Sequence, residues 1–254
     1  MKTLRREMAK QRDIVTARLS ILVLGIIVYL FILSRMINFT CSLNYSQGVV
    51  TSMADMIKSS LYRQTVFFVY IPVFLIYVYA MTVREIQSGR IVMFVNNKNY
   101  ARTLLMEKIL CVVSFVVLIA AASGILSYIV SGGKRMINFD VVSSAYFKET
   151  GDVSSVSFAE FEIRYLLYMT AFFYCVASVY DIIRLFTGKF VLSYILCVVA
   201  GIIVEFLKAD SVISFNYTNI GSLKVIIIMC IVAVVLSAVE YAAIYLAMKG
   251  RDFL

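Results

Sequence analysis

Three acidic residues lie inside long apolar runs of the chain, where a side chain with a titratable proton could do chemistry. Asp181 and Glu205 lie near the ends of their runs beside basic residues, so both are most simply paired or interfacial charges. Glu240 is deeper, about nine residues from Lys249, or roughly 13 Å along a helix. An acid at that depth is a functional candidate. It could face a translocation path, carry a proton or hydrogen-bond a neighbouring helix.

The rest of the composition excludes the commoner catalytic sites. The chain has no histidine, which removes histidine-ligated haem, a histidine-assisted nucleophile and the usual zinc sites of intramembrane proteases. Its Gly-Lys pairs, at 133–134 and 188–189, lack the earlier glycine and the following Ser or Thr of a nucleotide-binding loop. The five cysteines form no CxxC motif, and four lie in apolar runs. We therefore predict no enzyme active site, and no cofactor or metal held by this chain.

Composition places the chain in the membrane class. Of its 254 residues, 62% are hydrophobic and 15% are charged, and the apolar residues gather into runs of about 18 or more, enough for a helix to cross a bilayer. We expect an all-α integral membrane protein with residues 1–254 in one transmembrane domain. The six predicted spans are residues 19–39, 65–83, 109–130, 165–183, 190–207 and 225–248. The predicted outer segments are residues 40–64, 131–164 and 208–224.

The distribution of charge predicts the orientation. The segments on one side are residues 1–18, 84–108, 184–189 and 249–254. These segments hold 15 basic and 5 acidic residues. The rest of the chain holds 9 basic residues and, when Asp181, Glu205 and Glu240 in the predicted spans are set aside, 7 acidic residues. Because basic residues favour the cytosolic side, both termini are expected in the cytosol. Residues 1–18 have a basic, amphipathic pattern that predicts an interfacial helix on membrane lipid, although a frayed polar tail is the alternative.

Two local patterns predict helices that lead into spans. Residues Met53, Met56, Ile57 and Leu61 share one helical face, so a surface helix should precede the second span. Ser157 is followed three residues later by Glu160, a capping box that predicts a helix from residue 158 into the fourth span.

The only proline, Pro72, lies within the second span. It removes one backbone hydrogen bond and predicts a kink that neighbouring helices tolerate.

The segment between the second and third spans, residues 84–108, is polar and basic. Its apolar stretch, residues 91–95, is too short to span a bilayer. Asn96, Asn97 and Asn99 follow and favour a turn, and a second helical run is expected to start near Tyr100. The pattern predicts a helix, a turn and a helix at one membrane face, available to a soluble partner.

This segment resembles the permease subunits of ABC-2 type transporters, whose fold is called the type V exporter. In that family the second span is followed by a glutamate, a glycine, an apolar run, a polar turn with a basic residue, and a lysine that enters the third span. The chain has Glu85, Gly89, residues 91–95, Arg102 and Lys108 in that order. The proline common near the turn is replaced by the asparagine-rich residues 96–99.

The resemblance implies that residues 84–108 form a coupling helix, which docks on a cytosolic ATP-binding subunit. The coupling residues that it implies are Glu85, Gly89, Asn97, Tyr100, Arg102 and Lys108. It further implies an exporter in a bacterial plasma membrane, built from two identical or homologous permeases and two ATPases that bind ATP and Mg²⁺. The cargo class that it suggests is a peptide antibiotic or a hydrophobic drug, as in bacteriocin immunity and antibiotic resistance. Nucleic acid is not an expected partner.

Two other classes stay open. A proton-coupled secondary transporter would use Glu240, but such proteins show internal repeats or paired broken helices, and the sequence shows neither. The other class is a membrane sensor or scaffold that transports nothing. A separate alternative for residues 84–108 is an inner loop without a special role.

The predicted orientation can be tested with single cysteines in a chain freed of its five native ones. Asn97→Cys should react with an impermeant maleimide only after the membrane is opened, because residue 97 is expected in the cytosol. The control Ser154→Cys, in the outer segment 131–164, should react in intact cells. Labelling at position 97 in intact cells would place the basic segment outside and end this interpretation.

Overall fold

The computed structural model describes residues 29–39, 41–43, 45–46, 48, 52–59, 65–78, 97–130, 145–151, 157–206 and 217–249. Nearly all of these residues are helical, and no strand occurs among them. The predicted N-terminal interfacial helix and residues 84–96 of the basic segment lie outside the described residues.

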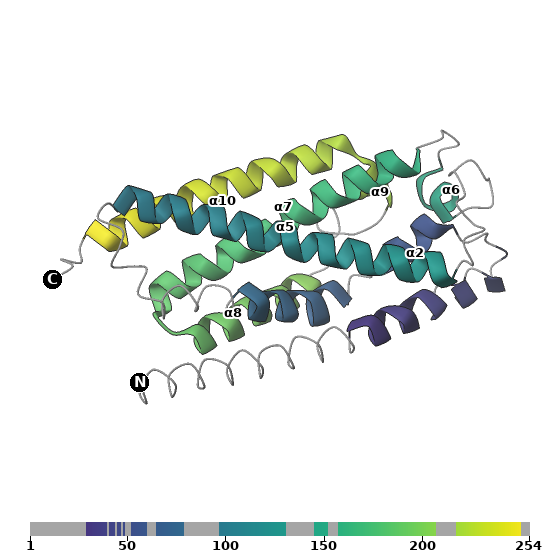
Figure 1. Ribbon diagram of the computed structural model, residues 1–254, viewed down its shortest axis with the longest axis horizontal. Coiled ribbons are helices and arrows are strands. Elements are labelled where there is room, and N and C mark those ends of the chain that lie inside the picture. The colour runs from purple at the N-terminus through teal and green to yellow at the C-terminus, as the bar shows by residue number, and fades with distance from the viewer. Residues whose placement is uncertain are drawn as a thin grey trace, which may run out of the picture.

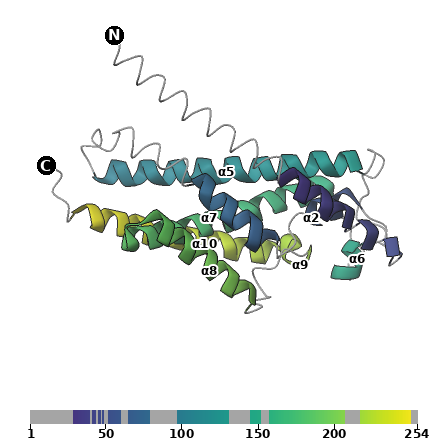
Figure 2. The same ribbon diagram turned by 90° about the horizontal axis from the view of Figure 1, so that it is seen from below.

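Three long helices run beside one another through the molecule (Figures 1 and 2). They are α5 (Asn97–Val130), α7 (Phe158–Thr187) and α10 (Leu223–Lys249). The parts that are long and apolar enough to cross a membrane are Lys108–Val130, Ala159–Thr187 and Leu223–Tyr245. The expected helical class and apolar character are therefore confirmed for these three spans.

The other apolar helices are shorter. They are Tyr29–Leu43, Val66–Val78 and α8 (Phe190–Phe206). Val66–Val78 and α8 fall within the predicted spans 65–83 and 190–207, whereas Tyr29–Leu43 runs past the predicted end of the first span at residue 39. The count of six spans stays a prediction. Three short helices, α2 (Met53–Ser59), α6 (Ala145–Thr150) and α9 (Tyr217–Gly221), lie together at one end of the long helices (Figure 1). The first residues of α5, the turn between α7 and α8 and the end of α10 lie at the opposite end.

Local signals define both ends of α7. Ser157 is its N-cap, and the Ser157 hydroxyl accepts from the Glu160 backbone N–H at 3.2 Å, which confirms the predicted start. At the other end Gly188 has φ 64°, and its N–H donates to the Arg184 carbonyl at 2.9 Å. Glycine takes this left-handed conformation without a steric penalty, so the chain turns directly into α8.

A kink is predicted at Pro72, and the structure has a π-helix just before this residue. Residues Val66–Tyr70 form the π-helix η1, in which the Ile71 N–H donates to the Val66 carbonyl five residues earlier. A proline ring crowds the carbonyl four residues before it, which here belongs to Phe68. The wider turn just before Pro72 accommodates that ring within an otherwise continuous helix.

The sequence predicts two further helices, one before the second span and one starting near Tyr100. Met53, Met56 and Ile57 are buried on α2, which confirms the expected apolar face, whereas Leu61 is outside the described residues. The helix expected from Tyr100 begins three residues earlier, at Asn97. Asparagine is tolerated in a first helical turn, so Asn97 and Asn99 are helical rather than part of the turn.

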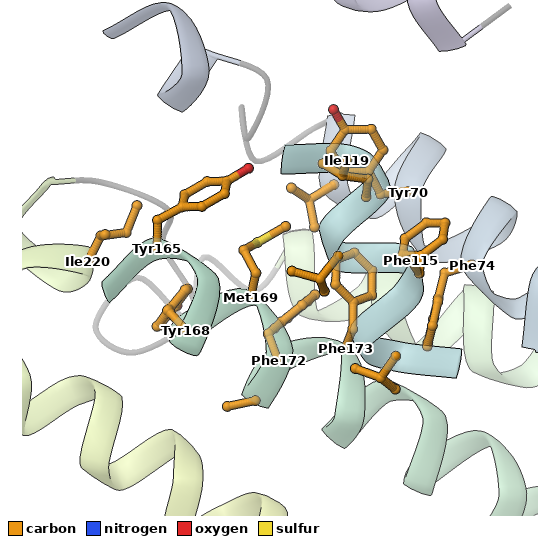
Figure 3. Close-up of a cluster of buried hydrophobic side chains, with 14 of the residues drawn as sticks. Tyr70, Phe74, Phe115, Ile119, Tyr165, Tyr168, Met169, Phe172, Phe173 and Ile220 are labelled. Carbon is orange, nitrogen blue, oxygen red and sulfur yellow. The ribbon is translucent and has the colours of Figure 1, made fainter. Parts of the chain in front are cut away.

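Aromatic side chains from three segments meet in the core. Phe74, Phe115 on α5 and Phe173 on α7 pack with ring centroids 4.9 to 5.2 Å apart (Figure 3). Such tilted and edge-on pairs add to the burial of apolar area. In contrast, large apolar side chains are exposed along α5 and α10, for example Leu110 and Val234. Exposed apolar faces of this extent suit a lipid surface.

The aromatic core predicts a difference between two substitutions on α7. Phe173→Ala removes a fully buried ring and should lower the free energy of unfolding by about 3 kcal/mol or more. Leu167→Ala, on the same helix but half exposed, should cost under about 1 kcal/mol. Thermal unfolding in detergent micelles measures both, and equal losses would show that this aromatic cluster does not dominate packing.

Candidate functional site

A lysine lies on the buried stripe of α5. Lys108, Val112, Phe115 and Ile119 recur every three or four residues, and all are buried. Only 4% of the Lys108 side chain is exposed. A buried ammonium needs charged or hydrogen-bonding partners, because its desolvation is otherwise very costly.

The partners of Lys108 come from two other helices. Its Nζ atom forms an ion pair with Oε2 of Glu240 on α10 and lies 3.3 Å from Oδ2 of Asp181 on α7. It also donates to the Ser178 hydroxyl at 3.2 Å. Glu240 has 2% of its side chain exposed and Asp181 has 23%. One ammonium therefore joins α5, α7 and α10.

Two further residues complete this site. The ring of Tyr174 on α7 has its centroid 5.2 Å from Lys108 Nζ, a cation–π distance. The Tyr174 hydroxyl lies 2.9 Å from Oγ of Ser237 on α10. We call the set the Lys108 cluster; its members are Lys108, Tyr174, Ser178, Asp181, Ser237 and Glu240.

The cluster lies near the end of the bundle at which α5 begins. Lys108 is 11 residues from Asn97, Asp181 is 6 from Thr187 and Glu240 is 9 from Lys249, so each is roughly 9 to 17 Å from its helix end. Their contacts with Lys108 bring both acids to its level in the bundle.

The charges of the cluster do not balance. When all three groups are ionised, two carboxylates face one ammonium and leave a formal charge of −1. Such an arrangement can fix the relative positions of helices, take up a proton or let the ammonium change partners. Among the residues that the structure describes, no three His, Cys, Asp or Glu side chains gather as a metal site.

A second polar group of residues ties the short helices together at the other end. Asp55 on α2 is buried and accepts from the Ser52 backbone N–H at 2.7 Å and the Ser52 hydroxyl at 2.8 Å. The hydroxyl of Tyr217 on α9 also donates to Asp55. Lys58 lies 4.1 Å from the centroid of the Tyr217 ring and pairs with Glu149 on α6. This Asp55–Tyr217 cluster therefore links α2, α6 and α9.

Burial shifts the pKa of the two central groups of the Asp55–Tyr217 cluster. Burial raises the pKa of the Asp55 carboxyl above its ordinary value, although Tyr217 and Ser52 donate hydrogen bonds to it. Burial also raises the pKa of the Tyr217 hydroxyl, and the neighbouring carboxylate adds to that rise. Both shifts make the neutral form more favourable in the folded protein than in the unfolded chain.

The structure places the predicted coupling residues in different settings. Glu85 and Gly89 lie outside the described residues, and Asn97, Tyr100 and Arg102 lie in the first turns of α5. Lys108 is on the same helix.

The side chain of Lys108 is turned into the bundle, where it meets Glu240, the predicted intramembrane acid. The backbone of Glu205 lies near the end of α8.

Sequence reasoning missed the pairing of Lys108 and the whole Asp55–Tyr217 cluster. The signal for Lys108 is its spacing from Val112 and Phe115, which places it on the buried face. Ser52 and Asp55 also have the spacing of an N-terminal cap. Neither pattern identifies the partner on another helix.

Comparison with family models, curated proteins and solved structures gives no match for this chain. Its function is therefore inferred from its residues and their geometry.

The raised pKa of Asp55 predicts a pH dependence at this end of the bundle. The folded state holds the Asp55 proton more tightly than the unfolded state does. Raising the pH past the ordinary carboxyl value of about 3.9 therefore favours opening until the raised native pKa is passed. Hydrogen exchange of the α2 amides, corrected for intrinsic rate, should show more protection at pH 4 than at pH 7.

Two variants test whether Asp55 causes this effect. Asp55→Asn should remove the difference between the two pH values, while Glu160→Gln, an exposed carboxylate on α7, should leave it intact. Equal protection of the native α2 amides at pH 4 and pH 7 would contradict the assignment.

Proposed function

We propose that this chain is the membrane subunit of an ATP-driven exporter, worked by a separate ATPase through residues 84–108. The observation that carries the proposal is the continuity of α5. This helix runs for 34 residues from Asn97 to Val130, so the second half of the basic segment and the third predicted span are one rigid rod. A displacement applied at Asn97 would therefore reach the middle of the bundle without a hinge.

The arrangement of helix ends supports the same proposal. The start of α5, the turn between α7 and α8, and the end of α10 lie at one end of the bundle (Figure 1). These positions belong to the basic segments that the charge pattern assigns to the cytosol. A soluble partner on that side would find the start of α5 at the same end as the turn between α7 and α8 and the end of α10.

The proposed mechanism needs partners that carry the nucleotide chemistry. Two ATPase subunits bind ATP and Mg²⁺, and each acts on one of two permeases, identical or homologous. Closure of the ATPases moves α5 and shifts the population between inward-open and outward-open states. The resemblance to ABC-2 permeases supports a peptide antibiotic or hydrophobic drug as cargo and the plasma membrane of a bacterium as location.

A second candidate function is proton-coupled transport, and one observation favours it. Glu240 is buried against Lys108 and close to Asp181, so the cluster holds one carboxylate more than its ammonium neutralises. Normal transport by Glu240→Gln would exclude an essential proton role for this residue.

The coupling role predicts the outcome of an affinity purification. Glu85→Ala combined with Arg102→Ala removes one acidic and one basic contact and should reduce ATPase recovery by about tenfold, because a close charge pair at an interface can contribute about 1.5 kcal/mol or more. The measurement is the ratio of ATPase to permease after purification.

The matched control changes an acid and a base at the opposite end of the bundle, through Lys148→Ala with Glu160→Ala. It should leave that ratio unchanged. Unchanged ATPase recovery and unchanged export in the Glu85 and Arg102 variant would remove the coupling role.

A further inference from the structure

Lys108 has two acidic neighbours that belong to different helices. Glu240 on α10 forms the direct ion pair, and Asp181 on α7 lies 3.3 Å from the same ammonium. The Ser178 hydroxyl is within reach of both Lys108 and the Glu240 carboxylate. The buried ammonium of Lys108 on α5 is thus shared between one acid on α7 and one acid on α10.

We propose that Lys108 exchanges between Glu240 and Asp181, so that its partner sets the position of α5 relative to α7 and α10. The exchange depends on the proposed function in one respect only, namely that the ATPase is what moves α5. The conformational states belong to this chain alone and exist without the ATPase.

The geometry allows exchange without leaving a buried ammonium unpaired. A lysine ammonium is a compact charge on a flexible four-carbon stem, and both carboxylates are close to it. With only one acid in reach, moving α5 would break a buried ion pair and strongly destabilise the protein. With two acids, the ammonium can leave Glu240 as it joins Asp181, while the Ser178 hydroxyl donates to Glu240.

The two partners differ in exposure, which makes the two states distinguishable. Glu240 has 2% of its side chain exposed, whereas Asp181 has 23%. Pairing with Glu240 therefore keeps Lys108 deep in the bundle. Pairing with Asp181 alone, after Glu240 is released, draws it toward water and opens the cluster. The structure describes a state in which Glu240 is the direct partner and Asp181 lies within ion-pair distance of the same ammonium.

A native cysteine provides the probe. Cys111 lies one turn along α5 from Lys108 and has 8% of its surface exposed. The test chain keeps Cys111 and carries serine in place of the other four cysteines, at positions 41, 175, 197 and 230. The full chain is reconstituted in lipid vesicles without ATP or ATPase, and the rate of alkylation by N-ethylmaleimide is measured.

Exchange predicts opposite effects for two neutralising substitutions. Glu240→Gln should raise the alkylation rate by about tenfold, because Lys108 is left with Asp181 and the open state gains population. Asp181→Asn should lower the rate by a similar factor, because Lys108 is left with Glu240. In a chain that also carries Lys108→Met, Glu240→Gln and Asp181→Asn should no longer change the alkylation rate in opposite directions.

A purely static cluster predicts another result. Both substitutions would then loosen the bundle and raise the rate together, or leave it unchanged, and either result would overturn the exchange. If Glu240→Gln does not yield a monodisperse protein, the Asp181→Asn rate decides alone, since this partly exposed position tolerates an amide of the same shape.

The result is independent of the ATPase test. Opposite changes in alkylation rate in the two variants would support the exchange even if no ATPase co-purified. Shifts of the same sign would reject the exchange while leaving an observed ATPase association intact.

Discussion

The ammonium of Lys108 imposes the strictest requirement on this bundle. It lies on the apolar, inward face of α5, where an unpaired charge would be very costly. The carboxylates that satisfy it come from α7 and α10, so the three long helices can pack only in rotations that bring these side chains to one point. Apolar contacts alone allow several helix rotations of similar energy, whereas a buried ion pair allows few.

Polar groups specify the two ends of the bundle, and aromatic packing fills its middle. The Lys108 cluster joins the long helices near one end, and the Asp55–Tyr217 cluster joins α2, α6 and α9 at the other. Between them the rings of Phe74, Phe115 and Phe173 pack in tilted and edge-on pairs that bury apolar area.

Helix α5 connects the basic segment to both the Lys108 cluster and the aromatic core. Its first turns belong to the basic segment, Lys108 follows after about three turns, and Phe115 and Ile119 lie in the core. A force on the basic segment would meet the ion pair before it met the aromatic core. Under the proposed function, the charge cluster is therefore the first internal contact that an ATPase would have to change.

The sequence by itself determined what depends on near neighbours in the chain. Apolar runs predicted the long helices, and the spacing of Ser157 and Glu160 predicted the start of α7. Pro72 predicted a local disturbance of its helix, although as a kink and not as the π-helix that precedes it. These features were predictable because the atoms that cause them lie within a few residues of one another.

The tertiary structure alone decided which charges meet. Lys108 and Glu240 are 132 positions apart, and Tyr217 and Asp55 are 162 apart. Helical periodicity places a side chain on a face, but it carries no information about which face of another helix lies opposite. That choice depends on the packing of the whole bundle, so Glu240 could be predicted as a functional acid while its partner could not.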